Sequence, residues 1–284
     1  MIITKLAGGL GNQLFQYAIG RSQAERLGVP LKIDTEHHVT DVKREYGLKH
    51  FNITAPIATS DEIRKLKHDS FLDTVVYKIF GKKNTSVCFE YDYKKFHPQA
   101  LTISDNTYLA GFWQKESYFK NIREILLREL TLKDPFPEKA SALVKKIKNT
   151  NSVSIHIRRG DYVLPKYQKV FHQCSPEYFY TAVDMIKEKV SNPHFFVFSN
   201  EIEWTKTLNF PENTTYVDDA AFDLEHYHDL VLMSQCKHNI IANSTFSWWG
   251  AWLNQNPDKI VIAPKRWFTE ESPTDVVPES WIRI

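Results

Sequence analysis

Short runs of β-branched and aromatic residues recur along the chain, and longer segments between them repeat apolar residues every three or four positions. The short runs are bounded by glycine, proline, asparagine or aspartate, which is typical of strands, and the longer period is typical of amphipathic helices. We predict strands in the sequences MIITKL, VPLKID, SVSIHI, HFFVFS, HNIIAN and KIVIAP.

The helical period is clearest in three segments. Residues 12–28 stop at Gly28, a residue that commonly ends helices, and residues 175–190 open with Ser175 as a cap and Pro176 at the first helical position. Residues 223–236 carry apolar side chains along one side. Because strands and helices alternate, we expect an α/β fold whose sheets are mainly parallel.

Residues 131–151 interrupt this alternation and contain a candidate domain boundary. In them, two prolines precede a lysine-rich helix and the next strand. We therefore predict an N-terminal α/β domain over residues 1–145 and a C-terminal domain over residues 146–284. Residues 54–108 show the weakest pattern, and we predict that they form a mixed helical insertion in the first domain.

Composition limits the partners and the compartment. The formal net charge of the 284-residue chain is only +2, so no broad basic surface for nucleic acid is expected, and any anion must be bound by a few placed residues. Its cysteines, Cys88, Cys174 and Cys236, form no CxxC pair, which favours a reducing compartment and no zinc site. Without a signal-peptide pattern or a membrane span, we expect a cytoplasmic protein.

A glycine-rich turn follows the first strand, in the sequence AGGLGNQ. Gly9 and Gly11 fit a dinucleotide fingerprint, but Leu14 stands where its third glycine belongs, so that fingerprint fails. Gly11 and Asn12 can still let a ligand approach the start of the next helix. A plain strand-to-helix turn is the alternative.

Two arginines end the strand in SIHIRRGDY. His156 and Arg158 project to one side of this strand, and Arg159 and Asp161 lie in the loop that follows. Two guanidiniums at the carboxyl end of a strand suit a diphosphate. The alternative is a surface salt bridge, such as one between Arg159 and Asp161.

Two later strand ends also carry polar side chains. The strand FFVFS ends in Ser199 and Asn200, where we favour a local turn cap. Asp218 follows another short apolar pair, and its carboxylate could accept the N1 and N2 hydrogens of guanine or cap the next helix.

The sequence NSTFSWWGAWLN combines polar residues at a helix start with three tryptophans. Side-chain hydroxyls and amides at this position bind phosphate or cap the helix; they belong to Asn243, Ser244, Thr245 and Ser247. We expect the tryptophans in the core rather than on a sugar. No DxD motif is present, so positive charge for a diphosphate must come from side chains and helix ends rather than from a metal ion.

Four motifs, GGLGNQLFQYA, HIRRGDY, FVFSN and NSTFSWWGAWLN, resemble in their order and spacing those of the α1,2-fucosyltransferase family, glycosyltransferase family 11. FWQKESYF resembles a further segment of that family, and the resemblance runs from Ile2 to about Pro264. It implies a GT-B-like fold, in which two Rossmann-like domains face a cleft. The first domain would be on the acceptor side, and the second would bind the GDP-sugar.

The same resemblance implies an activity: inverting, metal-independent transfer of L-fucose from GDP-β-L-fucose to the 2-hydroxyl of a terminal galactose, with no cofactor. The acceptor would be an oligosaccharide or a polysaccharide such as an O-antigen. This chain has no membrane anchor, as in bacterial members of the family. Peripheral attachment to the cytoplasmic face of the membrane is left open, as is the oligomeric state.

Site residues follow from the same motifs. Arg158 would be the main β-phosphate contact with support from Arg159, while His156 and Asp161 would shape that pocket. Asn12 would approach from the first domain, and the donor site would be lined by Ser244, Thr245, Phe246 and Ser247. We predict Arg158, His156 and Asp161 as catalytic residues, with Asp161 either as a weak base candidate or only orienting the arginines.

Two other functions remain open from the sequence. The chain could transfer fucose in another linkage, or another sugar from GDP. It could also be a non-catalytic nucleotide-binding protein, which would bind GDP or NAD without turnover.

Overall fold

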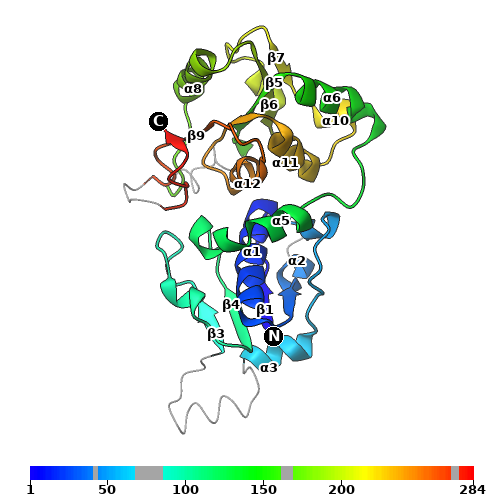
Figure 1. The fold of residues 1–284 in the computed structure, drawn as a ribbon, viewed down its shortest axis with the longest axis vertical. Helices are drawn as coiled ribbons and strands as arrows, with labels where there is room; N and C mark the ends of the chain where they lie inside the picture. Colours follow the sequence, from blue (N-terminus) through cyan, green and yellow to red (C-terminus); the bar gives the residue numbers. More distant parts are fainter. Residues whose placement is uncertain (41–43, 68–85, 161–168, 270–274) are drawn as a thin grey trace. The chain divides into compact units, whose positions relative to one another are not determined.

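The computed structural model describes residues 1–40, 44–67, 86–160, 169–269 and 275–284, and the chain divides into two compact units, Met1–Thr131 and Leu132–Ile284 (Figure 1). Each unit contains one sheet whose strands are all parallel. The predicted α/β class is therefore confirmed.

The border between the units differs from the predicted one at residues 145 and 146. That position lies inside helix α6 (Ser141–Asn149), whose Leu143 and Ile147 pack in one cluster with Phe196 of the second sheet. Because this apolar face is buried in the second unit, α6 belongs wholly to that unit. Its lysines face solvent, and the predicted lysine-rich helix is present.

The first sheet has the strand order β2-β1-β4-β3. These strands are β1 (Ile2–Lys5), β2 (Leu31–Asp34), β3 (Val87–Phe89) and β4 (Thr107–Ala110). Helix α1 (Leu10–Leu27) connects β1 to β2 and ends at Gly28, whose φ of 64° is left-handed. The predicted glycine stop is therefore confirmed.

Shorter elements complete the first unit. They are α2 (Glu36–Thr40), η1 (Gly47–His50), α3 (Ser60–Lys67), η2 (Pro98–Leu101), η3 (Glu116–Tyr118), η4 (Lys120–Ile122) and α5 (Arg123–Glu129). Residues 54–108 were predicted to form a mixed helical insertion. Their described part contains α3 and η2, but also β3 and the beginning of β4, which the sequence did not reveal because a strand as short as β3 shows no readable period.

The second sheet has the strand order β10-β9-β8-β5-β6-β7. These strands are β5 (Asn151–Ile157), β6 (Pro193–Ser199), β7 (Thr214–Tyr216), β8 (His238–Ile240), β9 (Val261–Ala263) and β10 (Ile282–Arg283). The chain builds outward from β5 to β7, then returns to the other side of β5 and builds outward again. This is the doubly wound Rossmann order, and its direction reverses between β5 and β8.

Helices cover the second sheet on two sides. Phe179 and Ile186 of α8 (Pro176–Lys189) pack with Val153 and Ile155 of β5. A separate cluster joins α6 and α11 (His226–Gln235) to Phe198 of β6, and α11 lies beside α12 (Thr245–Leu253). The remaining short elements are η5 (Glu138–Ala140), α9 (Ile202–Thr205) and α10 (Asp219–Phe222).

The tryptophans of α12 belong to the core. Trp248, Trp249 and Trp252 are at most 2% exposed, and the Trp248 indole donates to the Val276 carbonyl at 2.7 Å. The expectation that they lie in the core is confirmed, and they are too deeply buried to stack on a sugar. None of the described helices is both long and apolar enough to cross a membrane.

Candidate functional site

The point where the second sheet reverses direction brings together two predicted motifs. Strands β5 and β8 are paired in parallel, with Ile155 opposite Ile240, so their carboxyl ends lie at one edge of the sheet. Arg158 follows β5 and Ser244 follows β8 at this edge. In doubly wound sheets, ligands bind outside the carboxyl ends of the strands at this reversal.

Helix α12 begins at this edge. Its N-cap, Ser244, has extended backbone angles and forms no side-chain capping bond, and the first turn contains no acidic residue. The amide dipoles of this turn therefore favour an anion, as predicted for a phosphate site. Thr245 and Phe246 are half-buried beside it, whereas Ser247 is fully buried and donates to the Ser244 carbonyl at 3.3 Å. Ser247 therefore holds the helix start instead of facing a donor.

His156 lies beside these groups, on β5. Its imidazole is 5% exposed, and the centres of the His156 and Phe246 rings are 5.7 Å apart. Burial, with a smaller effect of the Arg158 charge, lowers the pKa of His156 to about 3, so the imidazole is neutral at physiological pH. Its Nδ1 atom has no hydrogen-bond partner in the part of the chain that the structure describes.

Arg159 is engaged at the end of the neighbouring strand β6. Its Nε donates to Glu201 Oε2 at 2.9 Å, its guanidinium carbon lies 3.7 Å from the centre of the Trp204 ring, and its amide donates to Asn200 Oδ1 at 3.2 Å. Arg159 therefore forms an ion pair with Glu201. The alternative partner, Asp161, lies outside the described residues, and its predicted role as base or as orienting group stays a prediction.

The turn after β6 has the predicted local cap. The Ser199 hydroxyl accepts from the Glu201 amide at 3.0 Å. Glu201 also accepts from the Gly160 amide at 2.9 Å, and its bond with Arg159 is the main cause that lowers the pKa of this carboxyl. Glu201 therefore ties the arginine loop to β6, a contact that the sequence did not reveal.

Asn243 has a different role from the predicted donor contact. Its amide donates to the carbonyls of His172 and Trp267, the latter at 2.9 Å, and its Oδ1 lies 3.7 Å from the Cys174 sulfur. The residue is 2% exposed. Asn243 therefore anchors two loops next to Ser244 and presents little surface to a ligand.

Asp218 is the N-cap of α10, where its Oδ1 accepts from the Ala220 amide at 3.1 Å. This is the capping alternative, and it does not support a guanine contact by that carboxylate. The buried acid nearby is Asp229 of α11, which is 8% exposed and paired with Asp219. Burial is the main cause that raises the pKa of both carboxyls, so they share a proton. An aspartate on the apolar side of a predicted helix was the signal for this pair.

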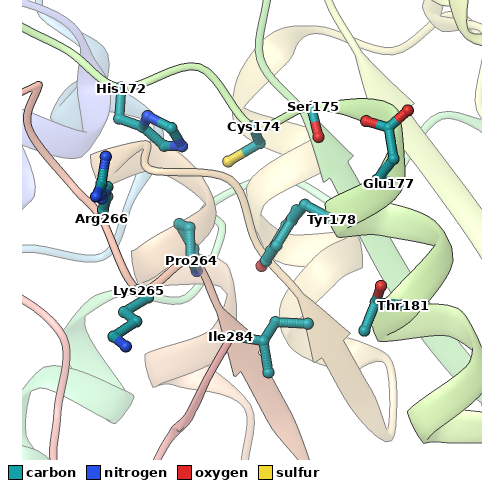
Figure 2. Close-up of a pocket in the computed structure, with 10 residues that line it drawn as sticks. All are labelled: His172, Cys174, Ser175, Glu177, Tyr178, Thr181, Pro264, Lys265, Arg266 and Ile284. Carbon is teal, nitrogen blue, oxygen red and sulfur yellow. The ribbon is translucent and has the colours of Figure 1, made fainter.

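A pocket of about 390 Å³ adjoins the same edge (Figure 2). His172, Arg266 and Lys265 lie at one end and Glu177, Ser175 and Thr181 at the other, with Cys174, Tyr178, Pro264 and Ile284 between them. The Tyr178 hydroxyl donates to the Ile241 carbonyl at 2.7 Å, and the Cys174 thiol is next to Asn243. The pocket wall is thus bonded to the chain that leads into α12.

In the first unit, the parallel strands β1 and β4 are neighbours, so their carboxyl ends lie at one edge of the sheet. The turn after β1 needs a glycine at Gly8, where φ is 78° and a Cβ atom would lie 2.8 Å from Asn12 Nδ2. Asn12 Oδ1 accepts from Gln114 Nε2 at 3.0 Å, which joins the two strand ends, and Gly11 is buried in the first turn of α1. The expected approach of Asn12 to the donor stays a prediction.

Metal-ligand geometry can be assessed only for the described ranges. Within them, no group of three or more histidine, cysteine, aspartate and glutamate side chains is arranged to hold a metal ion. Metal independence stays a prediction, to be tested with a chelator.

Residues 1–284 match the family model of Glycosyl transferase family 11. An α-1,2-colitosyltransferase of Escherichia coli is 36% identical over 296 positions, which cover 100% of this chain and 99% of that protein. The O-antigen biosynthesis glycosyltransferase WbnK of Escherichia coli is 30% identical, with 98% of this chain and 99% of that protein covered.

A more distant relative is galactoside α-(1,2)-fucosyltransferase 2 of the gorilla, which is 25% identical over 90% of this chain and 69% of its own length. A solved structure of NodZ α-1,6-fucosyltransferase, soaked with GDP-fucose, covers 89% of this chain and 91% of that chain, with 16% identity and a TM-score of 0.52. This likeness shows a shared fold and confirms the predicted GT-B-like class. From the motifs, the family model and these relatives, we conclude that the chain belongs to glycosyltransferase family 11.

Proposed function

We propose that this glycosyltransferase transfers L-fucose from GDP-β-L-fucose to the 2-hydroxyl of a terminal galactose, with inversion at the anomeric carbon and without a metal ion. The observation that carries the proposal is the meeting of Arg158, His156 and the start of α12 at the reversal point of the second sheet. The gorilla relative, named a galactoside α-(1,2)-fucosyltransferase, supports the choice of sugar and linkage.

Charge development explains why these groups would suit the reaction. When the bond between fucose and the GDP β-phosphate breaks, negative charge grows on the phosphate oxygens. A guanidinium and the first amides of a helix, both fixed in place, stabilise that charge most where it grows. Arg158 and the first turn of α12 would supply them, and the Ser244 hydroxyl would add a hydrogen bond.

The protonation state of His156 fits this arrangement. Because its pKa lies at about 3, the imidazole adds no positive charge to the site at neutral pH, and Arg158 remains the charged group on this side of β5. A neutral imidazole has one donor and one acceptor nitrogen. The unpartnered Nδ1 would bind a polar atom of the nucleotide.

The acceptor hydroxyl must lose a proton as it attacks the fucose ring from the face opposite to the phosphate. A positioned base accelerates such a step by about 10²–10⁴-fold. We keep Asp161 as the base candidate, with orientation of the arginines as its alternative role. We also propose that the reaction takes place in the cytoplasm.

A second donor has specific support. The relative that is 36% identical over this whole chain is named an α-1,2-colitosyltransferase, and colitose is L-fucose without its 3-hydroxyl. The same phosphate site and the same acceptor hydroxyl would serve GDP-colitose. The alternative donor thus changes the sugar but keeps the linkage.

The experiment offers the purified chain GDP-β-L-fucose or GDP-colitose, with lactose as acceptor, in the presence and absence of EDTA. We expect an α1,2-linked product, identified by NMR, whose rate of formation EDTA does not change. Arg158→Ala should abolish transfer while circular dichroism shows a folded protein, and the exposed Arg128→Ala is the matched control. Absence of transfer from both donors to any galactoside would contradict the proposal, and a different linkage would correct it.

A further inference from the structure

The first unit exposes a group of aromatic side chains at the end of β3 and β4, which we call the aromatic strip: Phe89, Tyr91, Tyr93 and Phe112. Phe89 is 50% exposed, Tyr91 80% and Phe112 37%, while Tyr93 is half-buried. Large aromatic residues normally bury most of their surface. An exposed cluster of them therefore points to a binding surface.

The rings of the aromatic strip are arranged in two pairs. The ring centres of Phe89 and Tyr91 are 5.6 Å apart, and those of Tyr93 and Phe112 are 6.2 Å apart with nearly perpendicular planes. Phe89 on β3 is paired with Ala110 on β4, two residues before Phe112, so the strip spans both strand ends.

The backbone beneath the strip is held in place by buried charged groups. Glu90, 7% exposed, accepts through Oε2 from the amides of Phe112 and Trp113 at 2.5 and 3.0 Å. The fully buried Lys115 donates from Nζ to the Tyr93 carbonyl at 3.1 Å. The rings therefore project from a fixed backbone, which lowers the entropy cost of binding a ligand.

One residue in this peptide has an unfavourable conformation. Trp113 is fully buried and has a φ of 56°, a left-handed value that a bulky side chain rarely adopts. Such a conformation persists only where surrounding contacts impose it. The bonds from Glu90 to the amides of Phe112 and of Trp113 itself fix the backbone directly before this φ angle and help to impose it.

The strip lies close along the chain to the residues that join the carboxyl ends of β1 and β4. Phe112 is followed two residues later by Gln114, whose amide donates to Asn12 at the start of α1. The Gly111 carbonyl accepts from Gln16 of α1 at 3.0 Å. A ligand at the carboxyl ends of β1 and β4 would therefore lie next to the segment that carries the rings.

We propose that the aromatic strip binds the sugar residues that precede the terminal galactose of the acceptor glycan. The ligand class is a chain of neutral pyranoses, whose C–H faces stack on aromatic rings while their hydroxyls bond to polar neighbours. The Asp92 carboxylate, between Tyr91 and Tyr93 and 39% exposed, is an acceptor for such hydroxyls within the same peptide. This inference rests on the proposed function for the identity of the occupant.

The charges of the strip favour a glycan over a membrane surface. Asp92 lies between Tyr91 and Tyr93, and its contacts with the Lys94 amide and with Lys95 lower the pKa of its carboxyl, so it is ionised. Glu90 adds a second acid, and Lys95 is paired with Asp92 at 3.4 Å. Binding to anionic lipid requires an excess of basic residues. In the segment of the strip, residues 89–95, Glu90 and Asp92 balance Lys94 and Lys95 in charge.

The test compares lactose with lacto-N-tetraose, a tetrasaccharide that ends in galactose, as acceptors for the wild type and for the double variant Tyr91→Ala, Phe112→Ala. We expect the KM for the tetrasaccharide to rise about tenfold, the loss of two stacking contacts, with kcat unchanged. The KM for lactose and the Kd for GDP should stay at their wild-type values. Equal KM values for the tetrasaccharide in both proteins would overturn the inference.

Two further variants and additional binding assays distinguish the possible outcomes. Tyr91→Phe retains the ring and should keep the wild-type KM within about twofold, and Ile57→Ala, at a side chain 55% exposed in the same unit, is the matched control. If neither donor is used, calorimetry of the tetrasaccharide alone still tests the strip, because binding that is lost in the double variant supports the inference while the proposed function fails. Wild-type binding to phosphatidylcholine or phosphatidylglycerol vesicles, or self-association, that the double variant loses would overturn it.

Discussion

Arg159 donates from its Nε to Glu201 Oε2 at 2.9 Å, across the carboxyl ends of two neighbouring strands. The Trp204 ring lies under the same guanidinium. We therefore propose that the two adjacent arginines differ in function. Arg159 fixes the loop to β6, and Arg158, on the His156 side of β5, is the arginine we assign to the phosphate.

Lysine substitutions separate the two arginines. Arg158→Lys should lower kcat by about 10²–10³-fold, the usual loss for one electrostatic contact to a transition state, whereas Arg159→Lys should cost less than about tenfold. Steady-state kinetics with the donor varied measures both. In a double-mutant cycle with Glu201→Gln, the Arg159 change should be non-additive and the Arg158 change additive. A larger loss of kcat for Arg159→Lys, with additivity to Glu201→Gln, would instead assign the phosphate contact to Arg159.

His156 should make stability fall in acid. The unfolded imidazole gains a proton below about pH 6.5, whereas the buried one gains it only near pH 3, so the free energy of unfolding falls as the pH is lowered between these values. The slope contributed by this residue is at most about 1.4 kcal/mol per pH unit. Urea unfolding at pH 7, 6 and 5 should show a shallower dependence for His156→Asn, and identical slopes would contradict the assignment.

The carboxyl pair of Asp219 and Asp229 should make stability depend on pH in the opposite direction. Its raised pKa means that the folded pair retains a proton that the unfolded chain has lost, so stability is greatest at low pH and falls as the pH rises through the raised pKa. Asp229→Asn removes the titrating carboxyl and with it this loss of stability at high pH. We expect the variant to be more stable than the wild type at pH 8 by at least about 1 kcal/mol, roughly one pKa unit, with a smaller gap at pH 5.

Asp218→Asn is the matched control for that comparison, because asparagine caps a helix about as well as aspartate. Its stability should stay within about 0.5 kcal/mol of the wild type at both pH values. A destabilised Asp229→Asn at pH 8 would show that the pair is held by contacts that only a carboxylate makes.

Gly111 should tolerate no side chain. A Cβ atom there would lie 2.4 Å from Glu90 Cβ and 2.8 Å from Trp113 Cε2. We expect Gly111→Ala to lower the free energy of unfolding by about 1–3 kcal/mol, measured by urea denaturation. Gly28→Asn is the control, since its site has no neighbour within 4 Å and asparagine accepts a left-handed φ. Equal effects of the two changes would contradict the steric argument.

The parts of the fold that the sequence predicts are those with a readable period. Strand β5 alternates over seven residues and α8 combines a proline start with an apolar face, so both were located correctly. Strands β3 and β10 have three and two residues and show no period, because tertiary pairing defines them. The predicted border falls within α6, because lysines separate the apolar residues of that helix in the sequence.

The site shows a similar division. Two adjacent arginines after an apolar strand can be recognised in the sequence. Arg158 and His156 could therefore be placed at a strand end before the structure was known. The partners that fix their surroundings could not, because Glu201 lies beyond the next helix and strand, and Asn243 turns toward two loop carbonyls. Adjacent aspartates at 218 and 219 look alike in sequence and differ only in which one faces a buried neighbour.

The pairing of β5 with β8 has a consequence for redesign of the enzyme. Arg158 and Ser244 belong to distant segments, and their separation is determined by which residues of the two strands stand opposite each other. A slip by one residue would displace one group by about 3.3 Å along the strand, more than a hydrogen bond tolerates, and would turn His156 to the other face. Attempts to change the donor sugar should therefore vary side chains beyond the strand ends and leave the strand lengths untouched.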